Sequence, residues 1–561
     1  MSRYKSVLLL FIFQVLLSSC SDKKPNFQTE ELIGVWSGLL FQTETAFSQI
    51  KLEPANEPTK ATLYKDGKEF IYPITSNNGA IKFTGDSGLR FDANYYGKEK
   101  TLHGVITHDL WAQSLKFLKG KNHWYSKINK PELIDTDYLV YLEFYRDATG
   151  CIQAKIQSNK ENREDHFIIE QVSFDNSNID FNITNKRFGI SAVYDDKQKT
   201  MAFNYRNASG KRNIALTKLK PEQLLGYLPR LTGKKYEYTM PNFPDNTIET
   251  ASLTDVGLDM SLVQLMDEMT KDKFLHLHSI IITKNKKLVF EEYFHGYHRE
   301  YLHDLRSAFK AITGLAVGKA MMKNSELKLE KPIGDYYPQY HIKDPQKKEI
   351  TVYHALTMTT GLQNENEDKM QRESADWVEY KLEHPMEHAP GEKYVYSDGG
   401  INLLSGVIQS ATNEYLPAFL QHKLLLPLGI NNFQMLTSPV GRGYLAGNFY
   451  LRPIDFTKIG LLMLSHGKWN GEQLIAKSWI EESTSPKVEK NHGYFWKLNE
   501  RTVAGKNMQS IEAWGNGGQF LIIIPEIEMT ITFTGGNYNV YPEMEKGFKL
   551  LDQYIFPAVT L

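Results

Sequence analysis

The feature of the sequence that most restricts its fold is a repeated pattern of short alternating segments between Leu32 and Lys220. Apolar residues recur there at every second position and are separated by Gly, Asn and Asp, which is typical of half-buried strands joined by turns. The pattern returns after about 98 residues. The matched segments are 81–83 with 179–181, 90–91 with 187–188, 96–101 with 194–200, and 115–117 with 214–216. Residues 28–220 are therefore predicted to form an all-β domain of two similar, barrel-like meanders.

A proline-containing connector at 221–250 separates this region from one with a different pattern. Four apolar residues beyond it share one face of a helix, a final helix is expected near the C-terminus, and four apolar runs between them are expected to be strands. The first helix carries Leu262, Leu265, Met266 and Met269, the strands are 280–282, 288–290, 520–524 and 529–533, and the last helix carries Phe548, Leu551 and Ile555. Residues 251–561 are predicted to be an α+β domain with an antiparallel sheet flanked by helices and an additional all-α region.

The first twenty residues have the pattern of a secretory signal. Arg3 and Lys5 precede an apolar run that is too short to span a bilayer, and Leu-Ser-Ser-Cys20 follows it. This ending resembles the lipobox of bacterial lipoproteins, which implies removal of the residues before Cys20, the last residue of the predicted signal segment 1–20, and lipidation of Cys20. The alternative is an ordinary signal peptide that contains Cys at its cleavage site. The lipobox implies a membrane-anchored protein in the periplasm or on the cell surface, and leaves Cys151 as a small buried side chain without an internal partner.

Charge and motif content exclude several classes of function. The chain carries 65 basic and 66 acidic side chains, whereas nucleic-acid binding usually requires a basic excess. It contains neither a Gly-x-Ser-x-Gly elbow nor a His-Glu-x-x-His motif, and its 16 histidines show no ligand spacing. No metal or cofactor is implied.

A Ser-x-x-Lys tetrad at Ser307 is the strongest candidate for catalysis. Six such tetrads occur in the chain, but only this one is preceded by a predicted hairpin and followed by a buried-type helix, 308–317. A Ser in the first helical turn lies near unpaired backbone N–H groups, and Lys310 would lie one turn further on the same face. We expect desolvation to lower the pKa of Lys310 so that it acts as a base. A capping Ser with a snorkelling Lys is the alternative.

Two further segments give this tetrad a family context. Tyr396 lies within Pro390–Gly400, about ninety residues after Ser307, where β-lactamase-related hydrolases carry a Tyr-x-Asn element. Ile350–Leu362 is similar to the T-x-x-H-L-L-x-M-x-S-G-L segment of the same proteins. From Leu258 to the C-terminus the chain therefore resembles the β-lactamase-related serine hydrolases, which include class C β-lactamases, D-Ala-D-Ala peptidases, family VIII esterases and aminohexanoate-oligomer hydrolases.

This resemblance implies a mechanism with a covalent intermediate. Ser307 would be the nucleophile, Lys310 its base and Tyr396 the proton shuttle, with the oxyanion held by the backbone N–H groups of Ser307 and Asn516. The expected substrates are small esters, amides or peptides. A catalytically inactive binding or regulatory lipoprotein, and a cell-wall peptidase specific for D-amino acids, stay open as alternatives.

The chain also departs from the family pattern at two places. Asp398 replaces the usual Asn, and Ala513-Trp514-Gly515 stands where β-lactamases carry Lys-Thr-Gly. The missing Lys removes a cation that would bind a substrate carboxylate, so weak or no β-lactamase activity is expected. Asp398, Trp514 and Gly515 are predicted to contact the substrate.

Overall fold

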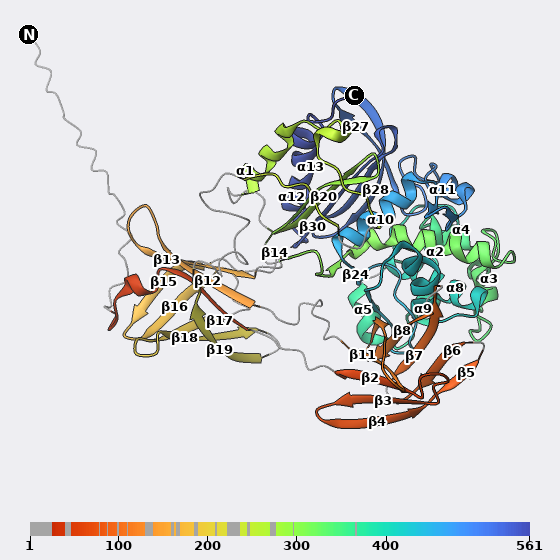
Figure 1. Ribbon diagram of the computed structural model, residues 1–561, viewed down its shortest axis with the longest axis horizontal. Helices are drawn as coiled ribbons and strands as arrows, with labels where there is room; N and C mark the ends of the chain where they lie inside the picture. Colours follow the sequence, from red (N-terminus) through yellow and green to blue (C-terminus); the bar gives the residue numbers. More distant parts are fainter. Residues whose placement is uncertain are drawn as a thin grey trace, which may run out of the picture. The chain divides into compact units, whose positions relative to one another are not determined.

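A computed structural model gives the fold of this protein (Figure 1). It describes residues 25–39, 47–77, 79–86, 88–97, 100–108, 110–128, 139–158, 162–163, 169–183, 189–207, 210–220, 236–243, 247–269, 276–294, 297–364 and 367–561. Contacts divide the chain into two units, 1–40 with 139–158 and 165–222, and 41–138 with 159–164 and 223–561. The predicted signal peptide and Cys20 lie outside the described residues. No helix of the described ranges is long and apolar enough to cross a membrane.

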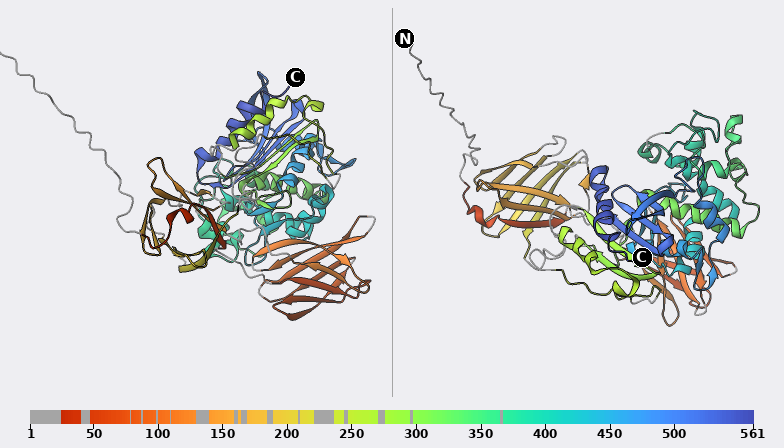
Figure 2. Two further views of the ribbon diagram at one scale, coloured as in Figure 1. Left: turned by 60° about the vertical axis from the view of Figure 1, so that its left-hand side comes forward. Right: turned by 90° about the horizontal axis from the view of Figure 1, so that it is seen from above.

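The first unit contains a curved antiparallel sheet of eight strands in the order β13-β12-β1-β19-β18-β17-β16-β15 (Figure 2). Its inner face buries an apolar core that includes Trp36, Leu142 and Phe203. The strands are β1 (Gly34–Leu39), β12 (Leu139–Arg146), β13 (Ile152–Ser158), β15 (Ile169–Asp175), β16 (Asn178–Ile183), β17 (Gly189–Asp195), β18 (Thr200–Asn207) and β19 (Gly210–Lys218).

Cys151 departs from its predicted role as a small, buried, unpaired side chain. It is half-buried and disulfide-bonded in the structure, so that prediction is wrong. The physical reason is its position just after a tight turn, Asp147–Gly150. The Asp147 carboxylate accepts a hydrogen bond from the Cys151 N–H at 3.1 Å, and this turn at the end of the strand leaves Cys151 only half-buried.

The second unit contains the remaining β-rich segment, arranged as two sheets that enclose a separate apolar core. A five-stranded sheet has the order β10-β11-β2-β3-β4, and an eight-stranded sheet has the order β22-β24-β23-β9-β8-β7-β6-β5. The strands are β2 (Gln49–Glu53), β3 (Lys60–Lys65), β4 (Lys68–Pro73), β5 (Thr75–Asn77), β6 (Ala80–Thr84), β7 (Arg90–Tyr96), β8 (Thr101–His108), β9 (Trp111–Lys116), β10 (Leu118–Lys119), β11 (Trp124–Lys127), β22 (His303–Asp304), β23 (Gln434–Leu436) and β24 (Phe449–Leu451).

The two meanders found in the sequence fall into different units. Strands β6 to β9 recur as β16 to β19 about 98 residues later, with the same antiparallel neighbours. The first meander continues into the C-terminal region because β9 pairs with β23, with Gln113 opposite Gln434. The structure thus divides the chain differently from the predicted single domain at 28–220.

Each meander is completed by a tryptophan-bearing strand that adjoins the other meander in the sequence. Strand β1 precedes the first meander but pairs with β12, with Trp36 opposite Leu142. Strand β11 precedes the second meander but pairs with β2, with Trp124 opposite Leu52. Each of these two tryptophan-bearing strands, β1 and β11, therefore pairs within the meander that it does not precede in the sequence.

The C-terminal region contains the predicted antiparallel sheet, with six strands in the order β21-β20-β30-β29-β28-β27. One face packs against η4, α1, α13 and η10, and the other packs against α2 and α10 (Figure 1). The elements are β20 (Leu277–Lys284), β21 (Lys287–Tyr293), β27 (Lys497–Val503), β28 (Lys506–Gly515), β29 (Gln519–Ile524), β30 (Met529–Gly535), η4 (Met260–Gln264), α1 (Leu265–Met269), α2 (Phe309–Lys323), α10 (Pro453–Leu464), α13 (Lys546–Leu550) and η10 (Leu551–Ile555).

A mainly helical region lies between α2 and α10 along the chain. Its helices include α4 (Val352–Leu356), α6 (Trp377–Glu383), α7 (Asp398–Asn402), α8 (Leu404–Thr412) and α9 (Leu416–Leu420). The predicted α+β architecture, with an all-α region and a preceding all-β region, is confirmed.

Candidate active site

Ser307 lies in a single 3₁₀ turn, η5 (Arg306–Ala308), between the short strand β22 and helix α2. The helix is buried almost along its whole length, because eleven of its fifteen residues are inaccessible to solvent. Ser307 itself is only half-buried, whereas Lys310 is 2% exposed. The nucleophile candidate is therefore accessible at the end of a rigid, buried helix, and the lysine one turn later is enclosed.

Three side chains from distant parts of the chain meet at this point. The Oγ of Ser307 is 2.6 Å from the hydroxyl of Tyr396, and the ammonium of Lys310 donates to both oxygens at 2.6 Å. Tyr396 is 44% exposed, so its hydroxyl can meet an incoming substrate. The geometry is a closed triangle of hydrogen bonds with one side open to solvent.

Two further groups hold the Lys310 ammonium. The carbonyl of Ala446 accepts a hydrogen bond at 2.7 Å, and the carboxylate of Asp398 forms an ion pair at 2.8 Å. Burial lowers the pKa of Lys310, but Asp398 and Tyr396 favour the charged form more strongly, so the pKa lies above the usual lysine value. The predicted lowering of this pKa is therefore wrong, because Asp398 supplies a negative charge that the usual Asn lacks.

The family segment 350–362 explains how Tyr396 is positioned. Thr351 begins helix α4 with a capping box, in which its Oγ1 accepts from the N–H of His354 and the His354 ring accepts from the N–H of Thr351. The chain after this helix then receives the tyrosine segment, because the carbonyl of Met358 accepts from the N–H of Val395 at 2.9 Å. The polar pair of Thr351 and His354 is thus structural, and it shapes the segment that docks the chain carrying Tyr396.

Ser397 fixes the direction of the neighbouring Asp398. Its side chain caps helix α7 and accepts from the N–H of Gly400 at 3.1 Å. Asp398 is consequently the first residue of the helix, where its carboxylate faces Lys310. Asp398 is predicted from the sequence to contact the substrate, and in the structure its carboxylate also has a direct partner within the catalytic group.

The end of strand β28 lies against the nucleophile turn. A Cβ atom on Gly515 would be 2.3 Å from the carbonyl oxygen of Leu305 and 3.1 Å from the nitrogen of Ala308, so a glycine is required there. Strand β27 pairs with β28 only as far as Glu512, which leaves 513–515 without a described strand on that side. This free edge adjoins the Ser307 turn.

The side chains of Trp514 and Asn516 are both held by neighbouring groups. The Trp514 ring packs 4.9 Å from Phe548 and its N–H donates to Glu512 at 2.7 Å, so the side chain supports the terminal helices. The Asn516 side chain is bound twice to Asn539, at 2.7 and 2.8 Å. The structure brings Ser307, Lys310, Tyr396 and Asp398 together, and it places Gly515 beside them through the backbone.

Sequence reasoning missed two contributors to this site. The Ala446 carbonyl is a backbone group, and side-chain patterns carry no signal for it. Asp304 contacts both the backbone and the side chain of Arg306, directly before the nucleophile, and the Asp-x-Arg-Ser spacing is the sequence signal for this pair.

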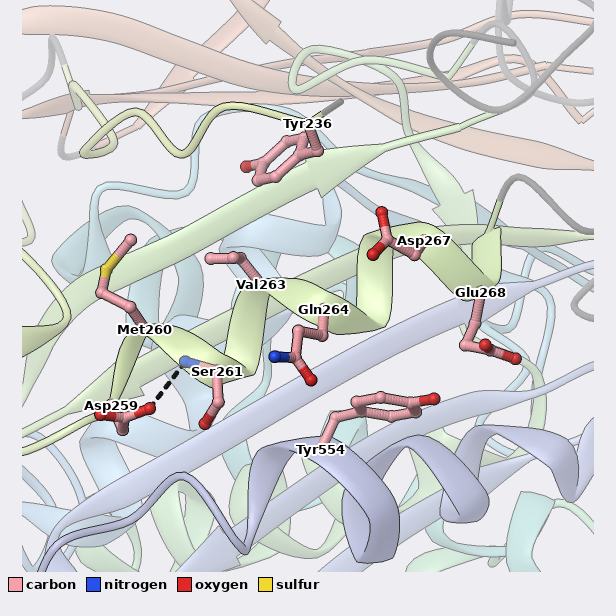
Figure 3. A pocket seen from close by; sticks show the side chains of 9 residues that line it. All are labelled: Tyr236, Asp259, Met260, Ser261, Val263, Gln264, Asp267, Glu268 and Tyr554. Atoms are coloured by element: carbon pink, nitrogen blue, oxygen red, sulfur yellow. Dashed lines mark hydrogen bonds between the residues drawn. The ribbon is translucent and has the colours of Figure 1, made fainter. Parts of the chain in front are cut away.

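A pocket elsewhere in the domain does not include these residues (Figure 3). It lies beside η4 and α1, with Tyr554 from the C-terminal turn on its other side. Asp259, Asp267 and Glu268 line it, and Ser307, Lys310 and Tyr396 do not. Its position separates it from the candidate active site.

Comparison with known proteins places the similarity in the C-terminal region. Residues 264–535 match the family model described as Beta-lactamase, and this match supports a β-lactamase-related serine hydrolase family for this part of the chain. Members of the family are typically serine hydrolases.

The individual relatives are distant. The chain is 27% identical over 165 residues to Protein flp of Staphylococcus aureus strains MRSA252 and NCTC 8325, a match that covers 27% of this chain and 33% of each relative. Among solved structures, a Bacillus anthracis protein described as a 6-aminohexanoate-dimer hydrolase is 19% identical, with a TM-score of 0.44 over 57% of this chain and 92% of that one. A penicillin-binding protein of Bacillus halodurans is 13% identical, with a TM-score of 0.42 over 52% and 98%.

Proposed function

We propose that this protein is a serine hydrolase that cleaves small esters, amides or peptides through an acyl-enzyme on Ser307. The observation that carries the proposal is the triangle of Ser307, Lys310 and Tyr396, with all three polar atoms 2.6 Å apart. A nucleophile within hydrogen-bond reach of a base, which is itself oriented by a third group, is the arrangement that acyl transfer requires.

The charge on Lys310 decides how the proton moves. Because Asp398 favours the ammonium form of Lys310, the group left to accept the Ser307 proton is the oxygen of Tyr396, 2.6 Å from the Ser307 Oγ. The Ser307 oxygen bonds to the substrate carbonyl carbon while its proton passes to Tyr396. The ammonium contacts both oxygens and compensates the negative charge throughout this transfer.

Breakdown of the tetrahedral intermediate follows the same path in reverse. Tyr396 gives its proton to the leaving oxygen or nitrogen as the carbonyl re-forms, which leaves the acyl group on Ser307. A water then attacks the ester, Tyr396 takes one proton from that water, and the proton returns to Ser307 as the acid product leaves. The backbone N–H groups of Ser307 and Asn516 are assigned to the oxyanion, at about 3–4 kcal/mol for each donor.

The charges around the site favour neutral substrates. Position 513 carries Ala in place of a cation, and the Asp398 side chain is 20% exposed next to Lys310. A substrate carboxylate would lack the Lys that the third motif of β-lactamases supplies and would approach an existing carboxylate. We therefore assign uncharged esters and amides ahead of peptides with a free terminal carboxylate.

Hydrolysis of p-nitrophenyl acetate and butyrate by residues 21–561 tests the proposal. The Ser307→Ala variant should lose activity by at least about a thousandfold, and Lys310→Ala nearly as much, while both keep the wild-type far-ultraviolet circular dichroism. Activity that persists in Ser307→Ala would identify a different nucleophile. A wild-type protein that is inactive on esters, amides and D-Ala-D-Ala peptides alike would favour the binding lipoprotein.

We also propose that the protein is anchored to a bacterial membrane through lipid on Cys20. The support is the lipobox-like sequence Leu-Ser-Ser-Cys20 after a short apolar run. The chain has two cysteines, so a disulfide of Cys151 within one chain would need the same sulfur that the lipid would occupy. Membrane fractionation of wild type and Cys20→Ser, combined with thiol titration, separates the two states. One free thiol on a membrane-bound wild type supports the anchor, and a soluble wild type without free thiol contradicts it.

A further inference from the structure

The residue before the nucleophile has an unusual backbone conformation. Arg306 has φ +49°, in the left-handed region that non-glycine residues seldom adopt. Such a conformation is unfavourable for a residue with a Cβ atom and persists only where the surroundings enforce it. Since Arg306 directly precedes Ser307, its conformation sets the direction of the Ser307 N–H group, which is one of the two proposed oxyanion donors.

Asp304 enforces this conformation with a single carboxylate. One oxygen accepts from the Arg306 backbone N–H at 2.8 Å, and the other lies 2.8 Å from Nε of the Arg306 side chain. Asp304 is itself 5% exposed, which strengthens both the backbone hydrogen bond and the ion pair relative to the surface. Backbone and side chain of Arg306 are thus held by the same group.

The other end of the Arg306 side chain reaches the second half of the site. Its guanidinium lies 4.5 Å from the ring centre of Tyr538, in β31 (Asn537–Tyr538). That ring lies against Gly517, where a Cβ atom would be 2.5 Å from it. Gly517 also has φ +93°, and its carbonyl accepts from the N–H of Asn537 at 3.0 Å. The position therefore excludes a side chain for two independent reasons.

Gly517 directly follows Asn516, whose N–H is the second proposed oxyanion donor. The Asn516 side chain is held by Asn539, next to Tyr538, through two hydrogen bonds. A continuous set of contacts consequently runs from the Ser307 donor through Arg306 and Tyr538 to the Asn516 donor. These two donors are more than two hundred residues apart in the chain.

We propose that Asp304, Arg306 and Tyr538 form a positioning clamp that holds the two oxyanion donors at a fixed separation. The inference rests on the proposed hydrolase function and extends it to three residues that do not touch the reacting atoms. An ordinary structural ion pair would stabilise the fold without affecting the transition state selectively, and this difference makes the clamp testable.

Arg306→Gly removes the side chain but allows the backbone to keep its conformation, because glycine adopts the left-handed region without strain. In residues 21–561, kcat for p-nitrophenyl butyrate should fall about 10- to 100-fold while KM stays within about twofold. Millimolar guanidinium should restore part of kcat by occupying the vacated site, and Arg306→Lys should retain an intermediate rate. Arg299→Gly is the matched control, since Arg299 forms a comparable ion pair with Glu291 in the same unit. It should lower the melting temperature without changing kcat, and guanidinium should not affect it.

Hydrogen exchange gives a second readout that does not depend on turnover. Arg306→Ala should accelerate amide exchange both at 304–308 and at 515–519, whereas Arg299→Gly should accelerate neither. A wild type without hydrolytic activity would end the proposed function, while the exchange result would still decide on the clamp. Unchanged kcat in Arg306→Gly, or faster exchange confined to 304–308, would overturn the clamp.

Discussion

The two β-meanders have the same strand order but opposite relations to the rest of the chain. In the first meander the outer face is buried, because Val105 of β8 and Ala112 of the adjoining β9 belong to the same apolar core as helix α2. In the second meander, Ala202, Asn204 and Arg206 on β18 match positions 103, 105 and 107 on β8. These three residues are partly or fully exposed. The inner faces of both are apolar, with Leu102 matched by Met201. The outer face therefore distinguishes a meander that joins the catalytic unit from one that does not.

Specific polar contacts fasten the first meander to the helical region. The Thr107 and Tyr415 hydroxyls are 2.6 Å apart, and Gln421 donates to the carbonyl of Gly104 at 3.0 Å. Strand β9 extends through β23 and β24 to β22, the strand that ends two residues before Arg306. One copy of the duplicated meander has therefore become part of the support for the nucleophile.

Replacing the two exchanged tryptophans should have the largest effect. Trp36→Ala and Trp124→Ala each remove a side chain that is nearly inaccessible, and each should cost about 3–5 kcal/mol. The loss should appear in different units, because Trp36 packs in the core of the first unit and Trp124 in that of the second. Hydrogen exchange of full-length protein would show which unit opens. Opening of the catalytic region by Trp36→Ala would contradict the division.

Exchanging the matched outer residues Val105 and Asn204 should have a slightly smaller effect on stability, and only in the second unit. Val105→Asn places an amide in an apolar core and should destabilise the second unit by about 3 kcal/mol. The reciprocal Asn204→Val lies on the partly exposed face of the first unit and should change stability by less than about 1 kcal/mol. Calorimetry of both variants measures this. Equal destabilisation would show that the outer faces are not what differs.

Acidification should weaken the first meander through a buried histidine. Burial and then Lys116 lower the pKa of His103 to about 4, whereas Ala202 at the matched position cannot titrate. As pH falls from about 6.5 towards 4, the unfolded chain binds a proton that the folded chain excludes, so stability falls. Between pH 7 and 5 the loss is about 2 kcal/mol. The His103→Gln variant should lose correspondingly less in thermal unfolding at these two pH values, although His422, with a pKa of about 4, retains its own contribution.

The hydrogen bond between Thr107 and Tyr415 should give the smallest effect. Thr107→Val keeps the shape of the side chain but leaves the buried Tyr415 hydroxyl without this partner, which should cost about 1 kcal/mol. Thr107→Ser keeps the hydroxyl and is the control, with a smaller loss from the missing methyl. Urea unfolding measures both. If Thr107→Ser were more destabilising than Thr107→Val, the methyl group rather than the hydrogen bond would fasten this face.

Much of the fold followed from local patterns. The hairpin of β20 and β21, the strands β29 and β30 and the two terminal helices all lie where periodicity predicts them, because each buries one regular face. The recurrence of β6–β9 as β16–β19 was likewise visible in sequence. Ser307, Lys310 and Tyr396 were predicted from motifs whose order and spacing along the chain resemble those of a known family.

The tertiary structure alone decided how these parts are combined. No local pattern indicates that β1 and β11 change places, or that β9 pairs with β23, because strand pairing depends on distant partners. The pKa shift of Lys310 was predicted in the wrong direction because it, too, depends on a distant partner. Sequence showed an apolar helix around it, but the pKa depends on where the Asp398 carboxylate lies in space, and electrostatic interactions act across distances that the chain order does not encode.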